Sequence, residues 1–338
     1  MTRLAIGPDG MTIGTAAIAG RPAGTAGWTK AFQADLVVSL GTALALTGLA
    51  ELFLQRVVYR VGVHIPREGA FLEAYRFATF AGDFAFRLAA ALLLLTTAAA
   101  VVWLVSRRTT LVAGLFLALL GLVNLLAWPL ASSLGLALAP LVFVFAAAWL
   151  VGRAARSGAS VALVLAVAAA ALALALAQYR AGMTALGAEP GGIATLQLIS
   201  EASLLAAAVL VAVAAGARVR ARWPAAVSAL LTLILLAGYA REPATVAIVS
   251  LWAVGVTMSL PGVLYVAAFG ALAFAAVSWA SRGETRHLAV GVVLLFVAGL
   301  QPQALHHGIT AFLGLVLLSV GAAGQGAVET RAEVLHAD

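Results

Sequence analysis

The chain has 338 residues, of which 64% are hydrophobic and 10% are charged, and its formal net charge is +7. A soluble domain carries about 25% charged residues, so this composition excludes a soluble fold. The arginines cluster in short loops between apolar runs, where they orient helices in a bilayer, and they do not indicate nucleic-acid binding. The sequence predicts an all-α, polytopic integral membrane helical bundle in contact with lipid.

The residue types that are absent or rare in the chain exclude several kinds of cofactor site and indicate the kind of organism it comes from. It contains no cysteine, which excludes disulfides, thiolate metal sites, iron–sulfur ligation and cysteine-attached haem. Lys30 is the only lysine and Asn124 the only asparagine. Such depletion is typical either of a GC-rich genome or of a thermophile. We expect a multi-pass protein of a prokaryotic plasma membrane.

Three segments are expected along the chain. Residues 1–34 are interpreted as a polar N-terminal segment, residues 35–324 as a transmembrane helical domain and residues 325–338 as a C-terminal tail. The first long apolar run begins at Leu36 and is too long for a signal-peptide core. No cleaved signal peptide is therefore expected.

A bilayer span needs about 20 apolar residues, and runs of this kind follow one another from residue 36 onward, which predicts ten or eleven helices. The last third is ambiguous, because Pro261 and Pro302 interrupt two long apolar stretches. The piece 288–300 would extend only about 20 Å, so 286–324 spans the membrane either once or twice. The predicted spans are 36–58, 76–105, 110–128, 133–152, 159–179, 194–216, 224–240, 244–259, 261–280, 288–300 and 304–323.

The loop 56–75 is the longest between predicted spans, and "HIPREG" within it favours an ordered extramembrane element that offers a docking surface. Arginine pairs or triplets occupy the alternate loops near residues 107, 153 and 220. Placing those loops inside puts the N-terminus in the cytoplasm. The arginines of the loop 56–75 oppose this orientation.

Charged residues inside spans are costly and are often functional. Four form a candidate intramembrane polar, proton or quinone site: Glu51, Asp83, Arg87 and Glu201. Asp83 and Arg87 are four residues apart and can pair on one helix face, or they form a coupled site for a proton, an ion or a lipid headgroup. Glu51 either makes a polar helix–helix contact or pairs with Arg56. Glu201 either relays protons or binds quinone, or it hydrogen-bonds a neighbouring helix.

Two adjacent histidines, His306 and His307, are candidate haem or proton-transfer residues. Neighbouring helical residues point about 100° apart, so both cannot ligate one ion from a continuous helix. No predicted span carries a histidine at its middle, where a bis-histidine haem would need one. The alternative is a pair of interfacial histidines at the start of a helix. No metal site is expected.

Catalytic motifs are missing from the sequence. No Walker A sequence, GxSxG elbow or HExxH helix is present, and no loop clusters carboxylates as a Mg²⁺-dependent transferase would. We therefore expect no enzyme, and at most a non-catalytic subunit of a redox complex.

Two functions remain. The first is a non-catalytic membrane subunit that anchors or scaffolds a respiratory or electron-transfer complex. A cytochrome or dehydrogenase partner would then hold the redox cofactor, and a haem b or a quinone, if bound, would lie at the interface with it. The alternative is a secondary transporter or permease with a site near the helix breaks at Pro261 and Pro302.

The stretch "SLWAVGVTMSLPGVLYVAAFGAL" (250–272), followed by a short helix and "QPQALHHGITAFLGLVLL" (301–318), resembles a known type of subunit. It is similar to the hydrophobic, non-haem membrane subunit of archaeal Cbs-type b-type cytochrome complexes. The resemblance covers the last third of the chain and carries over no functional residue. It implies an electron-transfer complex whose haem sits in a neighbouring extracytoplasmic subunit.

Overall fold

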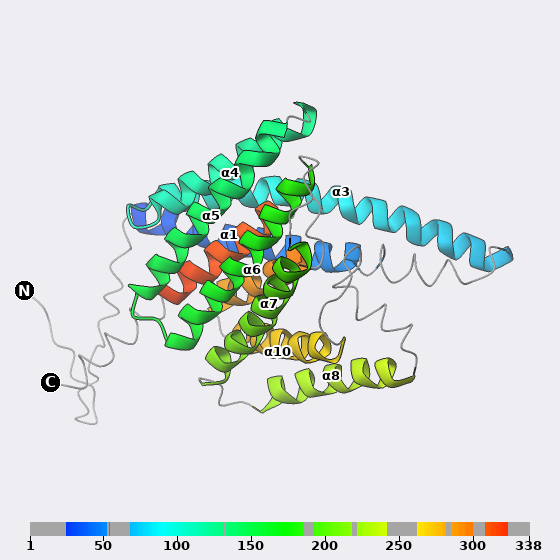
Figure 1. Cartoon of the computed structure of the whole chain (residues 1–338). Helices are drawn as coiled ribbons and strands as arrows, with labels where there is room; N and C mark the ends of the chain where they lie inside the picture. Colours follow the sequence, from blue (N-terminus) through cyan, green and yellow to red (C-terminus); the bar gives the residue numbers. More distant parts are fainter. Residues whose placement is uncertain are drawn as a thin grey trace, which may run out of the picture.

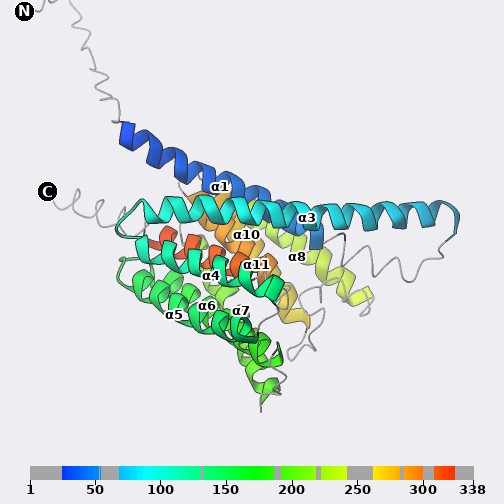
Figure 2. The same cartoon turned by 90° about the horizontal axis from the view of Figure 1, so that it is seen from above.

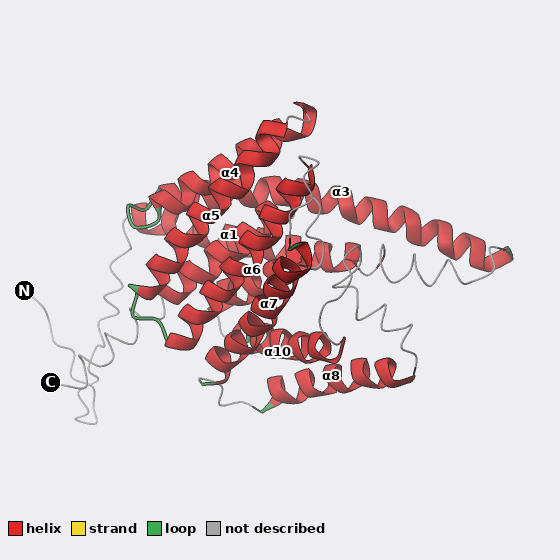
Figure 3. Ribbon diagram, in the orientation of Figure 1, coloured by secondary structure: helices red, strands yellow, loops and turns green. Residues whose placement is uncertain are grey.

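A computed structural model describes residues 25–52, 54, 68–130, 133–185, 192–217, 222–241, 262–281, 285–299 and 308–323. These residues are helical almost throughout and include no strand (Figure 3), which confirms the predicted all-α fold. Four helical segments are long and apolar enough to cross a bilayer, and the apolar parts of several further helices are shorter. The chain is therefore a multi-pass membrane protein.

The helices of the described residues follow the predicted spans closely (Figure 1). The last of them has no label, and we call it the terminal helix. The bounds are α1 Thr25–Leu52, α3 Gly69–Val105, α4 Leu111–Leu130, α5 Ser133–Ala155, α6 Val161–Ala185, α7 Ile193–Gly216, α8 Trp223–Arg241, α10 Gly262–Ala280, α11 Arg286–Gly299 and the terminal helix Gly308–Ala323. The predicted span 244–259, with Pro261 and Pro302, lies outside the described residues.

Two helices begin earlier than the hydropathy of the sequence indicates. α1 begins at Thr25, inside the segment 1–34 that was expected to precede the transmembrane domain. α3 begins at Gly69, inside the loop 56–75. Hydropathy detects the part of a helix that lies in lipid, whereas the backbone hydrogen bonds of a helix continue into water wherever the residues allow.

Contacts between helices define two ends of the bundle. α1 and α3 run antiparallel, because Ser106 donates a hydrogen bond to Gln33 at one end of the pair (3.3 Å) while Gly41 faces Thr96 further along. α1 and α11 run parallel, with Gly41 against Val290 and Gly48 against Val297. We call the end that contains the loop 106–110 the arginine end and the opposite one the Glu51 end.

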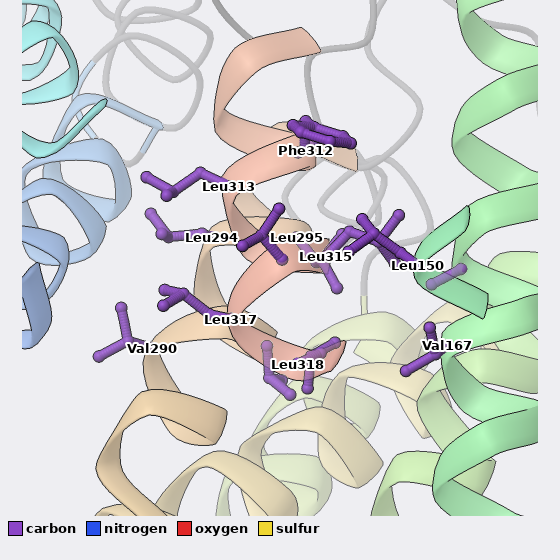
Figure 4. Packing of buried hydrophobic residues seen from close by; sticks show 14 of the residues in the cluster. Leu150, Val167, Val290, Leu294, Leu295, Phe312, Leu313, Leu315, Leu317 and Leu318 are labelled. Atoms are coloured by element: carbon purple, nitrogen blue, oxygen red, sulfur yellow. The ribbon is translucent and has the colours of Figure 1, made fainter. Parts of the chain in front are cut away.

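The terminal helix lies at the centre of the bundle. Nearly all of its side chains are buried, on every face of the helix. Its leucines point toward Leu294 and Leu295 of α11 on one side and toward Leu150 of α5 on the other (Figure 4). Phe312 makes an edge-to-face contact with Phe143 of α5, with ring centroids 5.8 Å apart. This helix is the core around which the other described helices are arranged.

The region 286–324 contains two antiparallel helices. Gly291 of α11 and Gly314 of the terminal helix meet backbone to backbone, since a Cβ built on either would lie 2.8–2.9 Å from the other's carbonyl oxygen. His287 lies beside Gly321 at one end of the pair. Small residues at such a crossing allow two membrane helices to approach closely.

Candidate functional site

Four polar side chains of the described helices, those of Glu51, Gln178, Gln197 and Glu201, lie between the middle of the bundle and its Glu51 end. α6 begins just after Arg156, at the arginine end, and α7 returns antiparallel to it, with Ser200 donating to the carbonyl of Ala173 (2.8 Å). The second half of α6 and the first half of α7 therefore lie toward the Glu51 end. The terminal helix begins there too, because Gly308 lies against the side-chain amide of Gln178.

Glu201 is half-buried on α7 and has a hydrogen-bond partner one turn earlier. The amide Nε2 of Gln197 donates to its Oε1 at 2.8 Å, and Gln197 itself is buried. Both residues also make further interactions. The spacing of four residues is the one that brings Gln and Glu side chains together on a helix, so the sequence carried a signal for Gln197 that our sequence analysis did not use.

Gln178 is the second polar residue that our sequence analysis missed. It lies on α6 beside the start of the terminal helix, and glutamine inside an apolar span is the signal that could have identified it. With Gln197 and Glu201 it lines one end of the α6–α7 pair. These groups can donate and accept hydrogen bonds, and Glu201 can in addition take up a proton.

Glu51 is 4% exposed near the end of α1 and is not without a partner. The antiparallel register of α1 and α3 places it at the level of Asp83 and Arg87. The side chains of Asp83 and Arg87, by contrast, are exposed. The structure therefore brings the three residues to one level of the bundle but into different surroundings.

Asp83 and Arg87 do not form an ion pair within the described structure. An ion pair does form nearer the start of α3, between Arg76 and Glu73 at 2.9 Å. Both of its side chains are exposed, so it contributes little to stability. The charges on this half of α3 thus face away from the other helices.

The two candidate histidines, His306 and His307, lie outside the described residues, and their role stays a prediction. Arg56, the expected partner of Glu51, also lies outside them. Among the residues that the structure describes, no group of three or more His, Cys, Asp or Glu side chains could hold a metal ion.

The first half of α3 is a second candidate functional surface. α3 has 37 residues, about 55 Å of helix, whereas the hydrocarbon core is about 30 Å thick. Its charge-free stretch, 88–105, accounts for about 27 Å. In the rest, 69–87, no residue before Gly82 is buried, and the start of the helix projects away from the bundle (Figures 1 and 2).

This projection carries four exposed phenylalanines, whose side chains are 60–72% exposed: Phe71, Phe77, Phe80 and Phe84. Phe77, Phe80 and Phe84 follow the spacing i, i+3, i+7, which places them on one helix face. We call these three the aromatic stripe. An exposed apolar face of this kind marks a surface that either a membrane or another protein covers.

No family model, curated protein or solved structure with which the chain was compared matches it.

Proposed function

We propose that the chain is a non-catalytic integral membrane subunit that anchors a partner subunit of a respiratory or electron-transfer complex. The observation that carries the proposal is the aromatic stripe on the projecting half of α3. If the charge-free stretch of α3 occupies the hydrocarbon, as this proposal requires, the three phenylalanines stand beyond the lipid tails. Burial against a partner protein removes them from water, at roughly 1.5–3 kcal/mol for each side chain that is fully buried.

The arginines support an orientation that suits such a partner. Arg107, Arg108, Arg153 and Arg156 lie at the end of the bundle opposite the α3 projection. By the positive-inside rule the arginine end faces the cytoplasm of a prokaryotic cell. The aromatic stripe then lies on the extracytoplasmic side, where the resemblance to the Cbs-type membrane subunit places the haem-carrying partner.

We call Glu51, Gln178, Gln197 and Glu201 the polar layer. These residues fit a supporting role in the same complex. Glu51 lies at the end from which the stripe projects, and Glu201 lies nearer the middle of the bundle, beside the Ser200–Ala173 contact. A quinone or a haem b propionate held by the partner would meet hydrogen-bonding groups here, and Glu201 would accept or release a proton. His306 and His307 keep their predicted role as interfacial or single proton-transfer residues.

The test is co-purification of the tagged chain from its native membrane in mild detergent, read by mass spectrometry and by a visible spectrum. We expect a cytochrome or dehydrogenase subunit and a haem spectrum. The triple variant Phe77→Ala, Phe80→Ala, Phe84→Ala should weaken partner binding by at least about thirtyfold, which is the effect of losing a single buried aromatic anchor worth about 2 kcal/mol.

A matched control uses the same helix inside the bilayer. Leu94→Ala, Leu95→Ala and Val102→Ala truncate three side chains that are 56–57% exposed in the charge-free stretch, and they should leave partner binding unchanged. Equal partner recovery from both triple variants would remove the docking role of the stripe. A colourless protein without a partner would overturn the complex-subunit proposal.

One observation favours the alternative of a secondary transporter or permease. Gln178 lies beside the start of the terminal helix, and Gln197 and Glu201 form a hydrogen-bonded pair on the neighbouring α7. Transporter sites are commonly built from polar groups near the ends of discontinuous helices. Purified chain in liposomes distinguishes the two functions. Solute accumulation that Glu201→Gln abolishes would establish transport, and its absence beside a haem-containing partner would favour the complex subunit.

A further inference from the structure

Two arginines at the arginine end are each held against a tryptophan one turn earlier. Arg107 lies over the ring of Trp103, with Cζ 5.2 Å from the ring centroid, and Arg153 lies over Trp149 at 5.8 Å. This is the geometry of a cation–π interaction. Stacking covers one face of each guanidinium and leaves the N–H edge of Arg107 available, whereas Arg153 already uses Nη1 in a backbone hydrogen bond and keeps Nη2 as its outer donor.

One loop brings these arginines together. The loop 106–110 connects α3 to α4 and carries Arg107 and Arg108. Arg153, near the end of α5, donates from Nη1 to the carbonyl of Thr109 in that loop. Arg156 follows on the next turn, and its Nε donates to the carbonyl of Gly152 at 2.9 Å. The four arginines therefore surround one junction of α3, α4 and α5.

The junction has unmatched positive charge within the described chain. None of its four arginines forms an ion pair there, and Asp35, an acidic residue of α1 at the same end, is exposed and unpaired with them. Two N–H donors, Nε of Arg153 and Nε1 of Trp103, are buried without an acceptor in the described residues. A half-buried guanidinium without a counter-ion and a buried N–H without an acceptor are both costly.

The depth of the junction determines which acceptor can reach it. Arg107 ends the charge-free stretch of α3, so the junction lies where hydrocarbon gives way to headgroups. Tryptophan is enriched at that level. Lipid phosphate is an acceptor that is present at that level around every membrane helix, and arginine binds phosphate through paired, charge-assisted hydrogen bonds.

We propose that the junction of Arg107, Arg108, Arg153 and Arg156 binds the phosphate headgroup of an anionic phospholipid. Arg107 and Arg153 supply the oriented guanidinium edges, because their tryptophans and the loop carbonyl hold them in place. Arg108 and Arg156 lie at the rim and add charge. Basic pockets between membrane helices are known to take anionic headgroups in this way.

The test measures lipid binding by native mass spectrometry of the full chain, released from nanodiscs that contain phosphatidylglycerol or phosphatidylcholine. We expect the wild-type chain to retain phosphatidylglycerol in preference to phosphatidylcholine. Arg153→Gln and Arg107→Gln should each weaken phosphatidylglycerol binding about tenfold, the effect of losing one charge-assisted pair. Arg107→Gln tests the site even if Arg153→Gln fails to fold, because the Arg107 side chain does not tie α5 to the loop.

The matched control is Arg76→Gln, which removes one positive charge from the opposite end of α3. It should leave phosphatidylglycerol binding unchanged. Equal binding in all three variants, or equal retention of the two lipids by the wild-type chain, would overturn the proposal. Competition by millimolar inorganic phosphate would assign the site to free phosphate instead of lipid. Cross-linking of the junction to an acidic partner subunit, with no lipid retained, would assign it to a protein.

Discussion

The backbone contact between α11 and the terminal helix predicts that a larger residue at Gly314 lowers the free energy of unfolding, because there is no room for a methyl group between the two helices. In the variant Gly314→Ala the new methyl group would lie 2.8 Å from the carbonyl oxygen of Gly291 and 2.9 Å from both the amide nitrogen and Cγ of Leu295. Two of these three atoms belong to the backbone of α11 and cannot rotate away. The two helices must therefore separate where both are buried.

The magnitude follows from two opposing effects. Overpacking of a filled core costs about 1–3 kcal/mol, while alanine in place of glycine inside a helix gains up to about 1 kcal/mol. We expect Gly314→Ala to lower the free energy of unfolding by about 1 kcal/mol. Gly121→Ala on α4 is the matched control, because its methyl would have one neighbour, Cγ2 of Thr97, at an ordinary 3.8 Å. It should gain stability, leaving a gap of about 2 kcal/mol between the variants.

The assay is unfolding of the purified chain in mixed micelles with increasing dodecyl sulfate, followed by tryptophan fluorescence. A double variant, Gly291→Ala with Gly314→Ala, should cost less than the sum of the single variants, because the helices need to separate once. If Gly314→Ala proved as stable as Gly121→Ala, the close crossing of the two helices would be refuted.

Three further variants test the core and the polar layer in the same assay. Ser319→Ala should cost about 0.6–1.7 kcal/mol, because it removes a buried hydrogen bond to α5 of 3.1 Å. Phe312→Ala should cost about 3–5 kcal/mol, since it empties a fully buried site against Phe143; a loss below 1 kcal/mol would contradict the central position of the terminal helix. Glu201→Leu should destabilise by about 1–3 kcal/mol, because the buried amide of Gln197 loses an acceptor, whereas Glu201→Gln should stay close to wild type; equal stability of these two variants would show that the hydrogen bond is dispensable.

The candidate site was only partly accessible to sequence reasoning. Glu51 and Glu201 were identified because carboxylates inside apolar spans are rare, and Gln197 could have been found from its spacing to Glu201. The exposure of Asp83 and Arg87 could not be predicted from the sequence, because their spacing of four residues permits an ion pair without requiring one. Whether two charged side chains on α3 are buried and paired depends on how far along α3 the neighbouring helices pack against it. That extent is a property of the packed helices.

The start of α3 also differs from the one that hydropathy predicts. The sequence predicts a span from residue 76, yet the helix begins at Gly69 and its first half has no buried residue before Gly82. Hydropathy reports preference for lipid, and the charges at Glu73, Arg76 and Asp83 do not interrupt a helix. The exposure of the aromatic stripe therefore depends on where the start of α3 extends beyond its neighbours (Figure 2).

By itself the sequence determined the class of the protein, because a chain with 64% hydrophobic residues can satisfy its backbone in lipid through helices. It also determined most helix positions, because apolar runs of bilayer length are separated by loops with arginine, glycine and proline. Only the tertiary structure decided which helix is central. In a soluble protein an all-round apolar helix is a buried one, but every span of a membrane protein is apolar all round, so hydropathy cannot rank them. The terminal helix is central because α5, α6 and α11 all pack against it, and this depends on how the helix surfaces fit together.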